Sequence, residues 1–538
     1  MPAEIVFVNG PIFTADPARS FARSLAVTGA NISAIGSESD VDESIGSSTR
    51  VVDLAGRLLT PGFQDAHCHP PTSGLDLLRC SFVGCSSAED AVAFVARYAA
   101  ENPEAPWIIG GGWQSTWFPR ACPPKELLDS VIPDRPVFVY NSDGHGAWAN
   151  SKALSMAGID AATPDPPDGR IERRPDGEPQ GTLHEGAAYL VERLVPKDTT
   201  EEIRLGILAA QRYLLSKGVT AWQDAHVDSG THEAYRSLVA SGELIGTAVG
   251  ALWWDRARGF EQIEELEQLR SEPAGGYRSV VVKLMLDGVV ENHTASMVEP
   301  YFSADGSVTD NRGIDFIDPG QLREIVTELD RRGFSCHFHA IGDAAVRSAL
   351  DGVEAARSAN GWSRARHHIS HIQVVDPSDI PRFRRLGVTA NAQALWAQNG
   401  VDQSELTMPF LGQTRSGWQY PFGSLLRSGA TFAMGSDWGV STADVMDQID
   451  TAVTRLNHDE PDLPPHNPGE RISLLDGLAG FTAGSAYVNH RDDVSGTLAV
   501  GMLADLVLLD RDPMVGGTIR DTSVAMTVVG GEVVFEEG

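Results

Sequence analysis

The sequence predicts an α/β protein built on a closed (β/α)8 barrel of the TIM type, joined to a β-sandwich made from both chain ends. Three observations support this prediction. Helices that end at glycine are followed at once by short apolar strands, eight such strands can be counted, and both ends of the 538-residue chain are rich in β-branched residues. A chain of this length is expected to form two or three domains.

Helix, glycine and strand follow one another through the middle of the chain. Thr199 and Glu202 form a capping box at the start of a helix that ends at Gly218, and a strand follows directly. Asp318 begins a helix that ends at Gly333, again before a strand. The eight candidate strands are Leu58–His67, Val219–Ala225, Leu244–Leu252, Val280–Leu286, Phe334–His339, His367–Ile372, Val388–Ala394 and Thr431–Gly435.

The domain boundaries follow from this count. Residues 1–60 and 490–538 share a β-rich texture and are expected to meet in one composite β-sandwich domain, while 61–489 form the barrel domain. About 150 residues separate the first two barrel strands, where a βα loop usually takes only a few. Residues 74–200 are therefore expected to form an inserted subdomain, and an excursion from a βα loop must lie over the barrel mouth.

Composition limits the partners and the compartment. The net charge of −31 argues against nucleic acid or an anionic membrane as partner, and leaves a small-molecule substrate and a homodimer open. No apolar run approaches the roughly 20 residues of a membrane helix, and no signal peptide is recognised. Five cysteines without metal-ribbon spacing fit a reducing, cytoplasmic location.

The end of the first strand, in TPGFQDAHCHPP, carries two histidines. Because side chains two residues apart on a strand share a face, His67 and His69 point together beyond the carboxyl end of the strand. That end is the active-site face of a barrel. Cys68 is expected to point into the outer layer and is not counted as a ligand.

Other strand ends carry matching groups. His339 ends the fifth strand, His371 the sixth, and Asp437 follows the eighth. Imidazole and carboxylate are preferred ligands of Zn²⁺, so the set predicts one or two divalent ions, with zinc favoured. His337 shares the face of His339 but lies deeper, and is expected to serve packing.

Each single histidine has a structural explanation as well, as a hydrogen-bonded core or surface group, and only the convergence of the set favours a metal site. His367 and His368 lie at the start of their strand, away from the mouth. Five more histidines lack any strand-end context and are expected to be surface or loop groups: His232, His293, His458, His466 and His490.

Lys283 lies inside an apolar strand, although only five of the 42 basic residues are lysines. Burying an unpaired ammonium is costly, and an arginine would pair a carboxylate at least as well. A buried amine can lose its proton and react with carbon dioxide, giving a carbamate that bridges two metals. The alternative is an ion pair with Asp287 or Asp437.

These motifs resemble the amidohydrolase superfamily, and more closely its YtcJ-like branch, amidohydrolase family 3, which includes N-substituted formamide deformylases. The resemblance rests on HCH after PGF, the lysine of the fourth strand, the histidines of the fifth and sixth strands and SD after the eighth. Further similar segments are PDRPVFVYNSDGHGAWANS, DGEPQGTLHEGA, VKLMLDGVVENHTA, HAIGDAAV and GMLADLVLLDRDP. Gln64 and the SHIQ at His371 depart from the branch pattern without removing a ligand.

The resemblance implies a metal-dependent hydrolase of C–N bonds (amide, formamide or cyclic amide). It implies a ligand set of His67, His69, His339, His371 and Asp437, with Lys283 as a carboxylated bridge. Asp437 is expected to act as general base and then acid, and His145, in the inserted SDGHGAW segment, to stabilise the oxyanion.

Tryptophans near the strand ends and in the insertion predict an apolar or aromatic pocket. The candidate pocket residues are Trp113, Trp253, Trp254, Trp396 and Trp438. An ester, lactone or phosphotriester hydrolase remains an alternative on the same barrel. A deaminase is less favoured, because AIGDA follows the histidine of the fifth strand where a glutamate is typical. A non-catalytic scaffold should have lost ligands, and none is missing.

Overall fold

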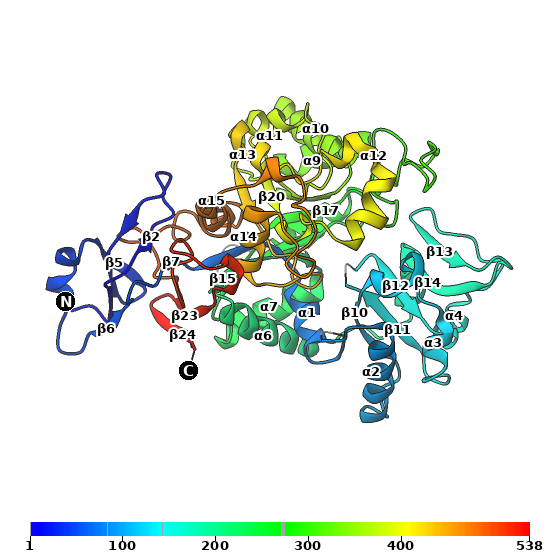
Figure 1. The fold of residues 1–538 in the computed structure, drawn as a ribbon, viewed down its shortest axis with the longest axis horizontal. Coiled ribbons are helices and arrows are strands. Elements are labelled where there is room, and N and C mark those ends of the chain that lie inside the picture. The colour runs from blue at the N-terminus through cyan, green and yellow to red at the C-terminus, as the bar shows by residue number, and fades with distance from the viewer. Residues whose placement is uncertain (1, 83, 143, 271–274, 538) are drawn as a thin grey trace.

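The computed structural model describes residues 2–82, 84–142, 144–270 and 275–537. Figure 1 shows three parts arranged along the long axis of the molecule: a sheet domain built from both chain ends, a central barrel, and the insertion, coloured cyan, at the other end. Among the described residues no helix is both long and apolar enough to span a membrane.

The central sheet confirms the predicted barrel. Its eight strands run in the order β21-β20-β19-β18-β17-β16-β15-β8, and all the neighbouring pairs are parallel. They are β8 (Phe63–Cys68), β15 (Val219–Val227), β16 (Thr247–Trp253), β17 (Tyr277–Met285), β18 (Ser335–Ala340), β19 (His368–His371), β20 (Thr389–Ala392) and β21 (Phe432–Met434). The two end strands approach each other, because the Asp437 amide beyond β21 donates to the His67 carbonyl of β8 at 2.7 Å.

Helices surround the barrel and bury its outer face. The helices that follow the barrel strands are α1 (Pro70–Asp76), α7 (Ser229–Ser241), α8 (Gln262–Leu269), α9 (Pro319–Arg331), α10 (Asp343–Asn360), α11 (Ile380–Leu386), α12 (Met408–Ser416), α13 (Phe422–Ser428), α14 (Val445–Thr454), α15 (Leu474–Ala479) and α16 (Ser485–Val488). Before β15 comes α6 (Thr200–Ser216), whose predicted capping box is present: the Glu202 amide donates to Thr199 Oγ1, and the Thr199 amide to Glu202 Oε2. The apolar faces of these helices pack against the barrel strands and form one large core with them.

The first predicted strand, Leu58–His67, is divided in the structure. β7 (Leu59–Pro61) belongs to the terminal sheet, and only β8 belongs to the barrel. Gly62 separates the two strands, and a Cβ atom there would lie 2.4 Å from Thr220 Oγ1. The chain can therefore pass from one sheet to the other only because this position has no side chain.

Two sheets form the sandwich made by the chain ends. One contains β1 (Ile5–Val8), β4 (Ser24–Thr28), β5 (Asn31–Gly36) and β6 (Arg50–Asp53). The other contains β2 (Ile12–Phe13), β3 (Phe21–Ala22), β7, β22 (Leu506–Leu509), β23 (Val524–Val529) and β24 (Glu532–Glu536). Leu508 of β22 pairs with Leu59 of β7, and residues from both chain ends share one core, which includes Phe7 and Met526.

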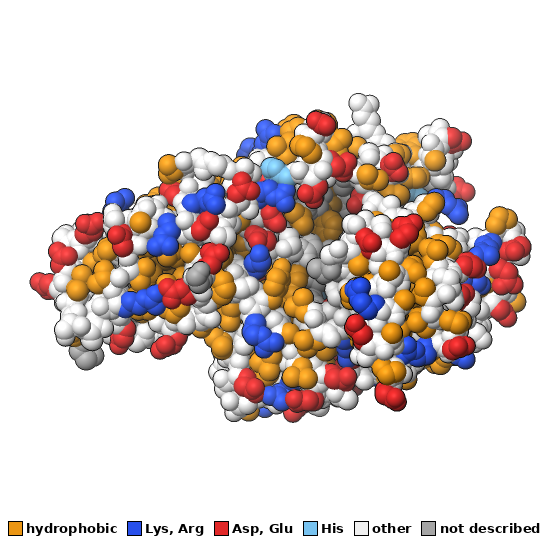
Figure 2. Space-filling model, turned by 60° about the horizontal axis from the view of Figure 1, so that its bottom comes forward, with side chains coloured by type: hydrophobic (Ala, Val, Ile, Leu, Met, Phe, Trp, Pro, Cys, Tyr) orange, Lys and Arg blue, Asp and Glu red, His pale blue; other side chains and the backbone are white. Residues whose placement is uncertain are grey.

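The insertion is a mixed sheet with its own helices. Its strands, in the order β13-β14-β12-β11-β10-β9, are β9 (Cys80–Ser81), β10 (Ile108–Trp113), β11 (Val137–Asn141), β12 (Gly146–Ala149), β13 (Gly169–Arg173) and β14 (Pro179–Glu185). Its helices are α2 (Ala88–Glu101), α3 (Lys125–Asp129), α4 (Ser151–Ala157) and α5 (Tyr189–Glu192). In Figure 2 the surface is hollowed between this part, on the right, and the barrel.

Candidate metal centre

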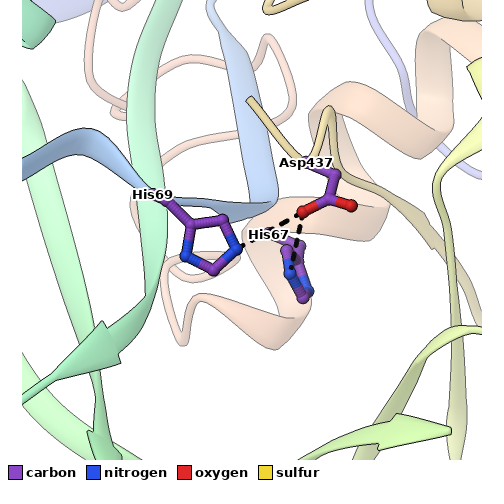
Figure 3. Close-up of side chains that lie close together, drawn as sticks. All are labelled: His67, His69 and Asp437. Atoms are coloured by element: carbon purple, nitrogen blue, oxygen red, sulfur yellow. Dashed lines mark ion pairs between the residues drawn. The ribbon is translucent and has the colours of Figure 1, made fainter. Parts of the chain in front are cut away.

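Three side chains meet where the first and last barrel strands end. His67 and His69 come from the end of β8, and Asp437 follows β21 (Figure 3). The Nε2 atoms of His67 and His69 lie 3.3 and 3.4 Å from the same oxygen, Oδ1 of Asp437. β8 ends at Cys68 and His69 directly follows it, so the end of this strand brings both imidazoles to the same carboxylate oxygen.

Asp437 is held in a strained position. Its φ of 58° lies in the left-handed region, which non-glycine residues rarely adopt and which often marks functional sites. Burial alone would raise the pKa of this carboxyl, but the facing imidazoles of His67 and His69 hold the pKa well below its usual range. The group is therefore an anion at neutral pH.

The cluster fits a divalent metal ion. Asp437 Oδ1 is buried, and among the described residues it makes no well-formed hydrogen bond, although two imidazole nitrogens lie 3.3 and 3.4 Å away. An unsatisfied buried oxygen costs about 1–3 kcal/mol. Burial lowers the pKa of His67 well below its usual range, so this imidazole is neutral and offers a lone pair. Neutral imidazoles and a carboxylate around one point are the donor set that Zn²⁺ prefers.

His371 and His339 extend the cluster along the mouth. His371 Nδ1 lies 3.8 Å from Oδ2 of Asp437, and its ring centre is 4.8 Å from that of His67. The His339 ring lies 4.4 Å from the His371 ring. Burial lowers the pKa of both imidazoles well below the usual range, so both are neutral potential ligands. The five predicted ligand residues thus lie next to one another.

A polar network supports the ligands from below. His337 Nε2 lies 2.8 Å from Nδ1 of His67 and 2.8 Å from the hydroxyl of Ser370. Its Nδ1 lies 2.7 Å from Oε1 of Gln223, which also contacts His368. His337 is therefore deeper than His339, as expected, but it holds the His67 ring in orientation rather than only filling space.

Lys283 is buried in β17, between Trp253 and His337 of the neighbouring strands. Burial lowers the pKa of its ammonium from 10.5 to about 7, although Asp437 acts in the opposite direction. The expected ion-pair alternative is not seen: among the described residues, no salt bridge joins the amine to Asp437 or Asp287. Oδ2 of Asp287 accepts hydrogen bonds from backbone amides instead.

The insertion adds an imidazole to the mouth. His145 lies just before β12, and its ring centre is 5.6 Å from that of His339. Its Nδ1 is 3.0 Å from both carboxylate oxygens of Glu185, at the end of β14. Thr294 donates a further hydrogen bond to Glu185 at 2.9 Å. A buried carboxylate thus fixes the His145 ring toward the barrel ligands.

The five predicted pocket tryptophans differ in how deeply they are buried. Trp113 is 1% exposed, and its indole nitrogen donates to the Val139 carbonyl within the core of the insertion. Trp254 and Trp438 are buried in the layer between strands and helices. Large aromatic rings are good core material, so packing explains the burial of these three side chains, and their role in a pocket stays a prediction. Trp253 and Trp396 are only partly buried.

The sequence analysis missed His226, at the end of β15. Its ring lies tilted against that of Trp253, with centres 4.3 Å apart, and the side chain is exposed. The signal was present, because QDAH occurs both at 64–67 and at 223–226. Asp65 and Asp224 of these repeats each accept a hydrogen bond from the backbone amide two residues later. Glu185 was also missed.

The barrel and the cluster at its carboxyl ends define a metal-dependent hydrolase of the (β/α)8 class. The model described as Amidohydrolase family matches residues 50–535, and the chain belongs to this family. It is 30% identical to Protein LONG AFTER FAR-RED 3 of Arabidopsis thaliana, over 99% of this chain and 92% of that protein.

One further relative and one solved structure are also similar to this chain, and both are named as hydrolytic enzymes. N-substituted formamide deformylase of Arthrobacter pascens is 25% identical over 99% of this chain and 98% of its own length. A solved structure of an uncharacterized metal-dependent hydrolase from Pyrococcus furiosus matches with a TM-score of 0.72 and 26% identity, over 95% of this chain and 99% of that one.

Proposed function

We propose that this protein hydrolyses a C–N bond, in an amide, formamide or cyclic amide, of a small apolar or aromatic substrate. The observation that carries the proposal is the buried Oδ1 of Asp437, which makes no hydrogen bond within the described part of the chain and lies 3.3 and 3.4 Å from two imidazole nitrogens. The similarity of this chain to N-substituted formamide deformylase favours an amide-type bond over an ester.

The residues at the barrel mouth would have distinct roles in the reaction. A divalent ion such as Zn²⁺, held by His67, His69, His339, His371 and Asp437, would lower the pKa of a bound water from 15.7 to about 7. Asp437, an anion close to that position, accepts the proton of the attacking water. It then delivers this proton to the leaving nitrogen, so that the amine departs neutral.

His145 would act on the other side of the scissile bond. Glu185 holds Nδ1 of its ring, and the imidazole lies beside His339 at the barrel mouth, where it would act as a donor to the substrate. A donor held in place before the reaction stabilises the negative charge that develops on the carbonyl oxygen. Trp253 with His226, and Trp396, would supply the apolar walls for the substrate.

Lys283 would complete the centre as a carbamate. A pKa near 7 leaves a large share of the amine neutral and nucleophilic at neutral pH. Its attack on carbon dioxide, with loss of one proton, gives an anion that can bridge two ions. We further propose a cytoplasmic setting, in which the five free cysteines stay reduced. A homodimer stays a prediction.

A substrate screen tests this function. The purified protein, loaded with Zn²⁺, is assayed against matched series of N-substituted formamides, amides, cyclic imides, esters, lactones and phosphotriesters, with Asp437→Asn as the control. We expect turnover of an amide-type series that disappears in the control. Turnover restricted to esters or phosphotriesters would overturn the assignment of the bond. A metal-loaded protein without activity on any series would favour a non-catalytic role.

A further inference from the structure

A second cluster of metal-binding side chains lies in the insertion. Cys122 follows a short turn, Glu172 comes from β13, and His184 comes from β14. One donor atom from each side chain lies within 4.8 Å of the other two. Within the described ranges, only this group and the barrel group His67, His69 and Asp437 meet that criterion.

His184 is the unusual member of the cluster. It is 3% exposed, and neither of its ring nitrogens has a hydrogen-bond partner in the described part of the chain. Its nearest charged atom is Oε1 of Glu172, 3.3 Å from Nε2. Glu172 thus lies close enough to pair with Nε2, whereas Nδ1 is buried without any partner among the described residues. Leaving such a polar atom unsatisfied costs about 1–3 kcal/mol, and a bound ligand would remove this cost.

The cysteine is held beside this ring by the backbone. Gln180 of β14 donates to the Cys122 carbonyl at 2.7 Å, and the Thr182 hydroxyl donates to the Pro123 carbonyl at 3.0 Å. The thiol is 4% exposed and donates to the Arg120 carbonyl. The segment that carries the thiol is thus fastened to the strand that carries the imidazole.

The donor chemistry of the cluster is that of zinc. Thiolate, imidazole and carboxylate are the three side-chain ligands of Zn²⁺, at about 2.0–2.3 Å from the ion. Burial raises the pKa of the Cys122 thiol to about 12, so the thiol stays protonated until a cation binds and replaces the proton. Arg170 hydrogen-bonds to Glu172 Oε1 at 2.7 Å and orients the carboxylate, as outer partners of metal ligands do.

We propose that Cys122, Glu172 and His184 bind a divalent cation of the zinc type, separate from the ion of the barrel. The cation fastens β13 and β14 to the segment that carries Cys122. His184 directly precedes Glu185, which holds His145 at the barrel mouth. The site therefore also stabilises the strand that positions the insertion's contribution to the active site.

Cobalt spectroscopy of the full chain tests the proposal without an activity assay. A thiolate bound to Co²⁺ gives a charge-transfer band in the near ultraviolet, and the proposed barrel ligands include no cysteine. We expect this band in the Co²⁺-loaded protein, unchanged in His67→Ala and in Cys85→Ser, a cysteine control in the same insertion. It should be absent in Cys122→Ser, which should also lose about one metal ion per chain by elemental analysis.

Two further variants keep the test decisive if Cys122→Ser fails to fold. His184→Asn and Glu172→Gln retain the thiol, and should weaken Co²⁺ binding by about 10-fold or more, as seen in titrations of the band. A Co²⁺-loaded wild-type protein without the band, or a band that persists in Cys122→Ser, would overturn the site. The cluster would then be an ion pair between His184 and Glu172 beside a buried thiol. Failure of the barrel chemistry would leave the band unaffected.

Discussion

The barrel mouth and the insertion each gather potential metal ligands, but they do so by different means. In the barrel, the ends of parallel strands bring His67 and Asp437 together, and a layer of polar side chains below holds the rings. In the insertion, Cys122 sits on an irregular segment fastened to β14 by two hydrogen bonds. The first cluster follows from the fold class, whereas the second depends on details of this particular insertion.

The largest effect is expected at the barrel cluster. Asp437→Asn would remove the anion proposed to accept the proton of water and would weaken metal binding, so kcat/KM should fall by about 10²–10⁴-fold. Steady-state kinetics on the substrate found in the screen measures this. The cobalt–thiolate band of the insertion should stay unchanged in the same variant. If the band is also lost, the two clusters are not independent and the comparison fails.

A substitution in the core of the insertion should lower the stability of that part of the protein. Trp113→Ala empties a fully buried indole site, and such substitutions cost about 3–5 kcal/mol of unfolding free energy. Hydrogen exchange should show the loss confined to the insertion, because the barrel has a separate core. Trp362→Ala, at a residue 70% exposed, is the matched control and should be neutral. Unchanged stability with altered substrate preference would return Trp113 to the pocket wall.

Lys283→Ala should reduce activity on the order of 100-fold, because it would remove the proposed anionic bridge. Short carboxylic acids should restore part of it by filling the vacated position. Only the neutral amine reacts with carbon dioxide, and its pKa is about 7, so in the wild type the gain from added bicarbonate should grow as the pH rises through 7. Lys217→Ala, which breaks a partly exposed pair with Asp444, serves as the control. A fully active Lys283→Ala would leave a one-metal centre.

The smallest effect is expected where the two regions meet. Glu185→Gln keeps the shape of the side chain but removes the charge that orients His145, and kcat should fall by about 10-fold. KM and the metal content should change little, which separates orientation from ligand loss. Glu178→Gln, on an exposed residue in the same hairpin, provides the comparison. A change in KM alone would assign His145 to substrate binding.

The barrel was predictable from the sequence because its signals are local and regular. A helix that ends at glycine fixes where the next strand begins, and strand-end positions such as His339 and His371 then follow from topology. Even so, the first strand was predicted too long. The Pro61-Gly62 pair in LLTPGF is a break signal, but it does not indicate that the chain changes sheet there. Only the closeness of Thr220 explains that change.

The insertion was less predictable, for physical reasons. Whether Trp113 packs inward depends on the neighbours it meets, and those are set by a sheet with both parallel and antiparallel pairs whose register the sequence does not specify. The spacing of Cys122, Glu172 and His184 matches no compact motif. Their closeness arises from the pairing of β13 with β14 and from a backbone that turns through left-handed residues before Cys122.

The terminal sandwich has a consequence for the order in which the chain folds during synthesis. β7 lies between β2 and β22, so the second sheet lacks half of its strands until residues 506–536 have left the ribosome. The first 60 residues must therefore wait, with apolar surface uncovered, while the barrel and the insertion are made. Residues 506–536 then complete this sheet, and Arg50 meets Glu536 at 2.6 Å. A stop codon shortly before β22 should give a nascent chain that chaperones retain.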